Sequence, residues 1–199
     1  MKYLILCLML LCNVAFGKQF TVYTDNHVFS PYLAINNLPT TKEQVVKENA
    51  LFLGDIVEGK NAEPKDCLKM KAFYNNLGTI AAGVIVLGNH DGSMVGVDNI
   101  IIDGRILITH GDRFLWDRKK SDKFRAEKQC QGSGMIQKAM AGRNGSISKS
   151  EAKQAAAYAK AFGVKIILFG HVHVEKTFDQ VVDGVRVISF PRGRTVIDL

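Results

Sequence analysis

The sequence contains little cysteine and no apolar run of the roughly 20 residues that a bilayer-crossing helix needs. Its four cysteines have neither the spacing of a zinc knuckle nor that of a redox pair. Cys7 and Cys12 fall in the first apolar run, so a processed chain would keep Cys67 and Cys130. In an oxidising compartment these two could form one disulfide, or they could be two buried thiols, and both alternatives stay open.

Residues 1–17 have the pattern of a signal peptide. Lys2 is a positive n-region, an apolar run extends from Tyr3 to Leu11, and the triplet Ala15-Phe16-Gly17 suits cleavage before Lys18. The run is shorter than the roughly 20 apolar residues of a bilayer-crossing helix, which disfavours an uncleaved anchor. We therefore expect a periplasmic or secreted protein with no stable membrane span after cleavage.

The remaining residues, 18–199, fit one domain. The chain has 199 residues and a hydrophobic fraction of 47%, enough for one substantial core and little more. It has no internal repeat and no low-complexity linker. Nothing in the sequence indicates an oligomeric state.

Positive charge is concentrated in one part of the chain. Between Arg113 and Lys160 there are twelve Lys or Arg against four Asp or Glu, a local surplus that exceeds the net charge of +7. A basic run is commonly a solvated face, but this one separates two groups of polar motifs. We expect residues 113–144 to form a partly helical, lid-like insertion. Its candidate substrate contacts are Arg118, Lys119 and Lys120.

Short apolar runs alternate with helical patterns along the chain, which indicates a layered α/β fold. Strands are predicted at 20–23, 50–53, 80–87 and 164–169, and hairpins at 99–109 and 181–190 that turn at Asp103-Gly104 and Asp183-Gly184. Helices are predicted to begin at Thr40 or Thr41, at Pro64 with an end at Gly78, and at Ser148 with an end near Gly163.

Clusters of Asp, Asn and His follow the apolar runs. They are Thr24-Asp25-Asn26-His27, Gly54-Asp55-Ile56-Val57-Glu58, Gly88-Asn89-His90-Asp91, Thr109-His110-Gly111-Asp112 and Gly170-His171-Val172-His173, and they contain all five histidines. In α/β sheets ligands gather at the carboxyl ends of strands, so the clusters are expected to converge. Asp25 and His27 point to the same side of an extended segment and could share one metal ion. Imidazole with carboxylate suits Mn, Fe or Zn better than Ca or Mg.

The motifs D-x-H, G-D-x-x-E, G-N-H-D, H-G-D and G-H-x-H, in this order from Asp25 to His173, resemble those of the calcineurin-like metallophosphoesterase superfamily. The resemblance implies a four-layer sandwich, in which helices flank two mixed β-sheets, and two divalent ions, with Mn favoured and Fe or Zn as alternatives. It implies that the first ion is held by Asp25, His27, Asp55 and His173, and the second by Asp55, Asn89, His110 and His171. It also implies that His90 acts on the leaving group and that Asp91 orients His90.

Two departures from the family pattern concern specificity. Glu58 stands where relatives usually carry Asp, and Phe190-Pro191-Arg192-Gly193-Arg194 stands where many carry Asn-Pro-Gly-Ser. Small bacterial phosphodiesterases and UDP-diacylglucosamine hydrolase are similar in pattern, the latter through the H-G-D motif and an insertion before G-H-x-H. That hydrolase works in the cytoplasm, which does not fit a signal peptide.

The resemblance implies two-metal hydrolysis of phosphate esters by a phosphodiesterase or phosphatase that acts on a small anionic substrate. A protein phosphatase is disfavoured, because Gly59-Lys60 stands where those enzymes carry Arg. A nuclease is the alternative, although the insertion has few aromatic residues for stacking besides Phe114, Trp116 and Phe124. A metal-free binding scaffold would have lost several ligands, and this chain has kept them all.

Overall fold

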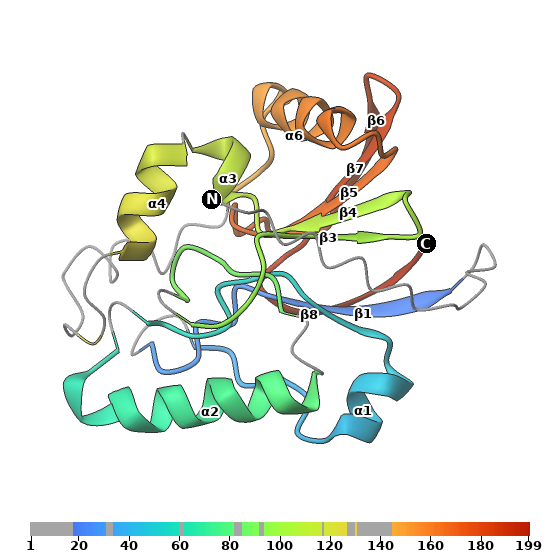
Figure 1. Ribbon diagram of the computed structural model, residues 1–199. Coiled ribbons are helices and arrows are strands. Elements are labelled where there is room, and N and C mark those ends of the chain that lie inside the picture. The colour runs from blue at the N-terminus through green and yellow to red at the C-terminus, as the bar shows by residue number, and fades with distance from the viewer. Residues whose placement is uncertain are drawn as a thin grey trace.

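Two β-sheets stack face to face, and helices cover the outer face of each (Figure 1). The computed structural model describes residues 18–30, 34–59, 62–81, 85–91, 94–116, 118–126, 130 and 145–199. The predicted signal peptide lies outside these residues. Within them, no helix has both the length and the apolar character needed to span a bilayer.

The smaller sheet has three strands in the order β2-β1-β8. β1 (Gln19–Thr24) pairs in parallel with β2 (Ala50–Phe52) and antiparallel with β8 (Gly193–Asp198). The sequence patterns predicted the first two strands, and the structure confirms them. The third strand, β8, was not predicted.

Helices α1 (Lys42–Lys47) and α2 (Cys67–Ile80) lie on the outer side of this sheet (Figure 1). The hydroxyl of Thr41 caps α1 by accepting a hydrogen bond from the backbone N–H of Gln44 at 3.2 Å. A 3-10 turn, η1 (Pro64–Asp66), leads into α2. The apolar side of α2 packs on the sheet in a cluster that includes Met70, Tyr74, Leu77, Tyr23 and Phe52.

The larger sheet has five strands in the order β3-β4-β5-β7-β6. They are β3 (Asn99–Ile102), β4 (Ile106–Thr109), β5 (Ile166–Phe169), β6 (Phe178–Val182) and β7 (Val185–Ser189). The central strands β4, β5 and β7 are parallel, whereas β3 and β6 pair antiparallel with their hairpin partners. Both predicted Asp-Gly turns are confirmed, since all four turn residues have positive φ, from 50° at Asp183 to 80° at Gly184.

Helix α6 (Lys149–Ala161) covers the outer face of this second sheet (Figure 1). Its predicted capping box is present, because Ser148 accepts from the backbone of Glu151 and the Glu151 carboxylate accepts from the backbone of Ser148. Four alanines of the helix are buried against the sheet, which lets the helix backbone approach closely. Gly163, with φ of 70°, follows the end of the helix as predicted.

A hydrophobic core lies between the two sheets. It comprises Val22, Leu53, Val86, Ile106, Ile108, Leu168, Ile188 and Phe190. The layers therefore follow as helix, sheet, sheet and helix, which confirms the predicted four-layer arrangement of two mixed sheets flanked by helices.

One predicted helix end is wrong, and the strand predicted at 80–87 is confirmed only at its end, with residues 82–84 outside the described part of the chain. Helix α2 continues past Gly78 to Ile80, and a Cβ at Gly78 would meet no atom within 4 Å, so this glycine sits in the helix without any packing role. The run expected as a strand at 80–87 therefore begins in a helix. Its end lies next to β2, where the backbone N–H of Val86 donates to the carbonyl of Phe52 at 3.0 Å.

The described part of the predicted insertion is helical. It contains α3 (Asp112–Leu115) and α4 (Arg118–Ala126), and most of residues 127–144 lie outside the described residues. The buried hydroxyl of Ser121 donates to the buried carboxylate of Asp112, and Arg113 forms ion pairs with Asp98 and Asp122. These contacts fix the two helices to each other and to the β3 side of the molecule.

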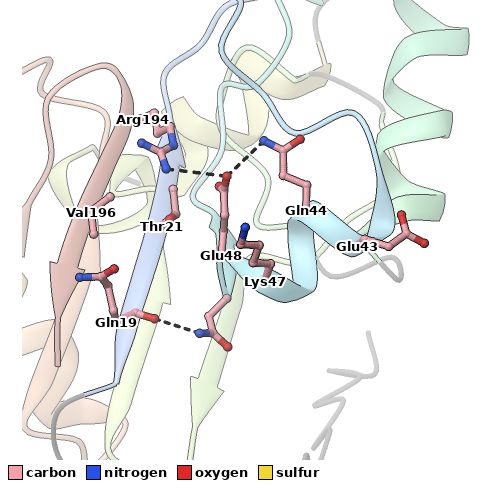
Figure 2. Close-up of a pocket in the computed structure, with 9 residues that line it drawn as sticks. Gln19, Thr21, Glu43, Gln44, Lys47, Glu48, Arg194 and Val196 are labelled. Atoms are coloured by element: carbon pink, nitrogen blue, oxygen red, sulfur yellow. Dashed lines mark hydrogen bonds and ion pairs between the residues drawn. The ribbon is translucent and has the colours of Figure 1, made fainter.

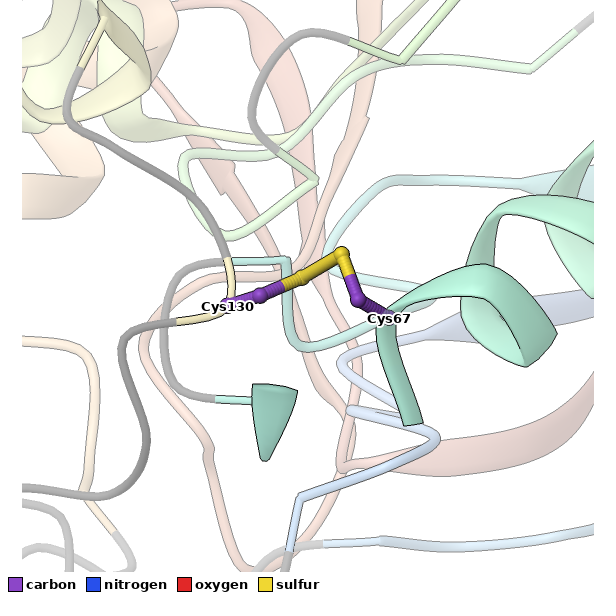
Figure 3. Close-up of a disulfide and its surroundings, with 2 residues drawn as sticks. All are labelled: Cys67 and Cys130. Carbon is purple, nitrogen blue, oxygen red and sulfur yellow. A yellow bond between two sulfur atoms is a disulfide. The ribbon is translucent and has the colours of Figure 1, made fainter. Parts of the chain in front are cut away.

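A disulfide joins Cys67, at the start of α2, to Cys130 (Figure 3). The two Cα atoms are 5.8 Å apart, and the bond closes a separation of 63 residues. The backbone N–H of Cys130 also donates to the carbonyl of Gly59 at 2.8 Å. The structure thus decides between the two alternatives for these cysteines and attaches the insertion to the loop that follows β2.

Candidate metal centre

The Asp and His clusters converge at the carboxyl ends of the strands. Asp25 follows β1, Asp55 follows β2, His110 follows β4 and His171 follows β5. Asp25, Asp55 and His171 have positive φ values of 51°, 50° and 70°, which non-glycine residues adopt rarely. Such backbone strain concentrates at functional sites, where the surrounding fold holds it in place.

One group of ligand atoms comes from Asp25, His27 and His173, whose candidate atoms all lie within 4.8 Å of one another. Nε2 of His27 is 3.3 Å from Nε2 of His173. Nε2 of His173 is also 3.2 Å from Oδ1 of Asp25. The other oxygen of Asp25 is held by the Thr24 hydroxyl at 2.8 Å and the His171 backbone N–H at 3.0 Å. The carboxylate is therefore oriented with Oδ1 towards the two imidazoles.

A second group comes from Asp55, His110 and His171, again within 4.8 Å of one another. Nε2 of His110 is 3.1 Å from Oδ2 of Asp55 and 3.2 Å from Nδ1 of His171. Nδ1 of His110 contacts the carbonyl of Leu53 at 2.9 Å, which fixes the tautomer that presents Nε2 to the group.

Asp55 lies between the two groups. Its Oδ2 is 3.1 Å from His110 in the second group and 3.9 Å from Nε2 of His27 in the first. Its Oδ1 accepts a hydrogen bond from the backbone N–H of His90 at 2.6 Å. Of the described carboxylates, this one therefore has the position of a bridge between two ions.

The donor set fits a pair of divalent metal ions. Oδ1 of Asp25 and Oδ1 of Asn89 are buried and accept no hydrogen bond, an arrangement that is costly unless a cation lies beside them. Glycines leave the backbone close to the carboxylates: a Cβ at Gly88 would lie 2.1 Å from Oδ1 of Asp55, and one at Gly170 2.4 Å from Oδ2 of Asp25. The site therefore combines buried oxygens and facing imidazoles that can bind cations, and the two glycines leave space for this arrangement.

The charges in the centre perturb the histidines in opposite directions. Burial alone lowers the pKa of His110, but the carboxylate of Asp55 outweighs it and raises the pKa to about 10. Burial and the neighbouring His110 lower the pKa of His171 to about 4. The negative charge that favours a proton on His110 equally favours a divalent cation, and metal binding would release that proton.

Glu58 contacts two histidines at once. Its Oε2 is 2.9 Å from Nδ1 of His27, and its Oε1 is 2.6 Å from Nδ1 of His90. Burial raises the pKa of Glu58, but His90 and His27 outweigh it and lower the pKa to about 2. For His90, burial is outweighed by Asp55 and Glu58, and the pKa rises to about 9.

Asp91 has a different place from the one the resemblance implied. Its Oδ2 accepts from the backbone N–H groups of Asp55 and Gly88, both at 2.8 Å, and its Oδ1 accepts from that of Val57 at 3.0 Å. These bonds join the loops after β2 and around Gly88. The carboxylate at Nδ1 of His90 is that of Glu58, where the sequence pattern had assigned Asp91 to orient this histidine.

Two residues beside the centre were not singled out as site residues from the sequence. The Trp116 ring meets the His171 ring edge-on, with 4.6 Å between centroids, and Lys120 Nζ lies 4.5 Å from the centroid of the Trp116 ring. Nε of Arg192 lies 3.5 Å from the backbone carbonyl of Asp25. The signal for Arg192 was that Phe190-Pro191-Arg192-Gly193-Arg194 replaces the usual Asn-Pro-Gly-Ser pattern, and the signal for Trp116 was its place among the few aromatic residues of the insertion.

The three residues predicted to contact substrate lie in the insertion. Lys119 and Lys120 are both exposed, Nζ of Lys120 lies over the Trp116 ring, and the side chain of Arg118 lies outside the described residues, so a substrate contact by any of the three stays a prediction. A polar cavity of about 700 Å³ lies elsewhere, between α1 and the edge of the smaller sheet, and shares no residue with the centre (Figure 2). There Arg194 pairs with Glu48 at 3.7 Å.

The sandwich and the convergent Asp/His centre define a calcineurin-like phosphoesterase fold and site. The family model for calcineurin-like phosphoesterases matches residues 18–175, so the chain belongs to this family. A search of the curated proteins gives no match.

Three solved structures that match this chain share little sequence with it. Vacuolar Protein Sorting 29 from Cryptosporidium parvum has 15% identity and a TM-score of 0.46, over 89% of this chain and 76% of that one. A conserved protein from Streptococcus pneumoniae, described as a predicted phosphoesterase, has 16% identity and a TM-score of 0.45, over 92% and 85%. A single mutant of Vps29 from Entamoeba histolytica has 16% identity and a TM-score of 0.44, over 92% and 86%.

Proposed function

We propose that the chain is a dinuclear-metal-dependent hydrolase of phosphate esters, a phosphodiesterase or phosphatase that acts on a small anionic substrate. The observation that carries the proposal is the position of Asp55, whose Oδ2 faces His110 on one side and His27 on the other. A carboxylate between two groups of imidazole and carboxylate donors suits a pair of ions that act on one phosphoryl group.

The ligands divide between two ions in this proposal. Asp25, His27 and His173 would hold one, Asn89, His110 and His171 the other, and Asp55 would contact both. Imidazole nitrogens with carboxylate oxygens favour manganese, with iron and zinc as alternatives. Bound metal ions would polarise the phosphoryl oxygens and lower the pKa of a water molecule, so that no Ser or Cys nucleophile is needed.

His90 would donate a proton to the leaving-group oxygen. Its Nδ1 is held by Glu58, which leaves Nε2 for the substrate, and its side chain is 16% exposed, whereas the neighbouring side chains of His27 and Asp55 are almost fully buried. A pKa near 9 keeps the imidazole protonated at neutral pH, as a proton donor requires. Glu58 would act through His90 by fixing the orientation of the ring.

The insertion would form one wall of the substrate site. Trp116 lies against His171 and Lys120 lies over Trp116, which brings an aromatic surface and a positive charge next to the second group of ligands. Arg118 and Lys119 neighbour this position in the sequence and would add charge for remote anionic groups. A small phosphorylated substrate with such groups fits this wall, and a nucleic-acid backbone is the alternative.

We also propose that the protein is periplasmic or secreted. The Cys67–Cys130 disulfide supports this, because disulfides persist in oxidising compartments and are rare in the reducing cytosol. Cell fractionation of the full chain, with sequencing of the mature N-terminus, tests the proposal. It predicts export and an N-terminus at Lys18.

The activity is tested with protein that has been stripped of metal and reloaded with Mn, Zn or Mg. Each form is assayed with an aryl phosphomonoester, an aryl phosphodiester and single-stranded DNA. The proposal predicts Mn-dependent hydrolysis of at least one small ester. Cleavage of DNA alone, with strong salt dependence, would establish the nuclease alternative, and no hydrolysis under any metal would overturn the assignment as an enzyme.

A further inference from the structure

The arginine in the segment between β7 and β8 lies next to the first group of ligands. Arg192 contacts the backbone carbonyl of Asp25 through Nε at 3.5 Å and is partly buried. Asp25 supplies Oδ1, the buried oxygen that faces His173. The guanidinium therefore lies at the edge of the candidate centre, on the side of its first group.

The backbone on both sides of Arg192 is fixed by packing. Phe190 is buried between the two sheets, and its backbone N–H donates to the carbonyl of Phe169 at 3.2 Å. Gly193 has a φ of 90°, and a Cβ there would lie 3.0 Å from the side chain of Asn37 and 3.1 Å from that of Ile35. The backbone is thus held on both sides of Arg192, and its side chain extends to the carbonyl of Asp25.

Burial of this guanidinium has an energetic cost. Desolvation lowers the pKa of Arg192, and the nearby Asp25 offsets part of that effect. An arginine keeps its charge even so, because its pKa in water lies far above neutral pH. The fold therefore holds a permanent positive charge next to the candidate metal site. When no anion is bound there, this charge repels metal ions and opposes their binding. Such a placement is favourable when an anion occupies the same space.

We propose that Arg192 is a substrate-binding residue that contacts non-bridging oxygens of the phosphoryl group at the first group of ligands. This inference rests on the proposed hydrolysis of phosphate esters. The planar fork of a guanidinium matches two oxygens of a phosphoryl group, a geometry that lysine cannot reproduce. Arg192 accordingly gives this chain a phosphate contact at a position where many relatives carry Gly or Ser.

Arg194 provides a matched control two residues further along the same segment. It is exposed, stands opposite Tyr23 in the register of β8 with β1, and pairs with Glu48 in the polar cavity away from the centre (Figure 2). Arg194→Gln therefore removes the same charge two residues away, on β8, without touching the candidate phosphate site.

The test measures binding of inorganic phosphate by calorimetry to metal-loaded wild type, Arg192→Gln, Arg192→Lys and Arg194→Gln, with the metal content of each protein determined. The proposal predicts that Arg192→Gln keeps its metal and weakens phosphate binding by roughly 10- to 100-fold, since a hydrogen-bonded charge is lost. Arg192→Lys should fall between wild type and Arg192→Gln, and Arg194→Gln should bind as wild type does.

Unchanged phosphate affinity in Arg192→Gln would overturn the inference. Loss of metal in Arg192→Gln would also overturn it, because the residue would then support Asp25 and not the substrate. If wild type binds metal and phosphate but hydrolyses no ester, the proposed function fails, whereas the comparison of the four proteins still decides the role of Arg192.

Discussion

Oε1 of Glu58 lies 2.6 Å from Nδ1 of His90, while the other oxygen of the same carboxylate holds His27. One side chain thus links a candidate metal ligand to the candidate proton donor. Relatives usually carry Asp at this position, and the longer Glu allows a single carboxylate to reach both rings here.

Glu58→Gln is expected to lower kcat by about 10- to 100-fold, the usual cost of losing a residue that orients a ligand or catalytic group. The amide cannot accept hydrogen bonds from two imidazoles through two oxygens. Because Glu58 raises the pKa of His90, its removal lowers that pKa, and the alkaline decline of kcat should move to lower pH. A pH–rate profile identical to that of wild type would contradict this role.

His90→Ala is expected to keep two metal ions per chain and to lose about 10²- to 10⁴-fold in kcat, the range for a general acid. The reason is that Glu58 holds Nδ1 of His90 at 2.6 Å, so we assign this imidazole to the leaving group, although it also forms a candidate ligand group with His27 and Asp55. His171→Ala is the comparison, since it removes a candidate ligand and should show first in metal content. Metal analysis that finds one ion in His90→Ala would make His90 a ligand.

Neutralising Arg118, Lys119 and Lys120 together is expected to raise KM for a large anionic substrate, with less effect on a small aryl phosphodiester. The control replaces Lys149, Lys153 and Lys160, which are exposed on α6. Steady-state kinetics on both substrates separate the outcomes. Equal losses on both substrates would indicate a structural role, and no loss on either would leave these residues as a solvated face.

The Cys67–Cys130 disulfide is expected to stabilise the folded chain by about 2–4 kcal/mol, because it restricts the unfolded state over a separation of 63 residues. The double variant Cys67→Ser, Cys130→Ser should lower the denaturant midpoint accordingly, and reductant should have the same effect on wild type only. Two free thiols in the oxidised wild type by thiol titration would show that the bond does not form.

The sequence predicted the centre better than it predicted the contacts around it. Asp25, Asp55 and His110 end apolar runs, and the carboxyl ends of neighbouring strands meet at one edge, so their convergence follows from local pattern and topology. Which carboxylate reaches His90 depends on how the loop after β2, with Glu58, and the loop with Asp91 are placed relative to each other. That placement cannot be predicted from the sequence of either loop. The pattern therefore assigned Asp91 to a place that Glu58 occupies.

Two features of the fold, strand β8 and the end of helix α2, were not predicted correctly because both depend on contacts between distant parts of the sequence. The sequence of strand β8 places Val196 next to Ile197, so it lacks the alternation of polar and apolar residues that marks a strand, and its partner β1 is far away in the sequence. Gly78 suggested a helix end, yet the hydrogen bonds of α2 continue to Ile80, because apolar packing of Tyr74 and Leu77 on the sheet outweighs the low helix propensity of one glycine.

The central claim is that Asp55 joins two metal ions in one hydrolytic centre, and the metal content and activity of Asp55→Asn test it most directly. Asparagine keeps the volume but removes the charge that faces both ligand groups, so both ions should bind weakly and hydrolysis should fall below detection. Asp179→Asn, on the exposed strand β6, is the control for the same chemical change. Elemental analysis that finds two tightly bound ions in Asp55→Asn, with hydrolysis at the wild-type rate, would contradict the account.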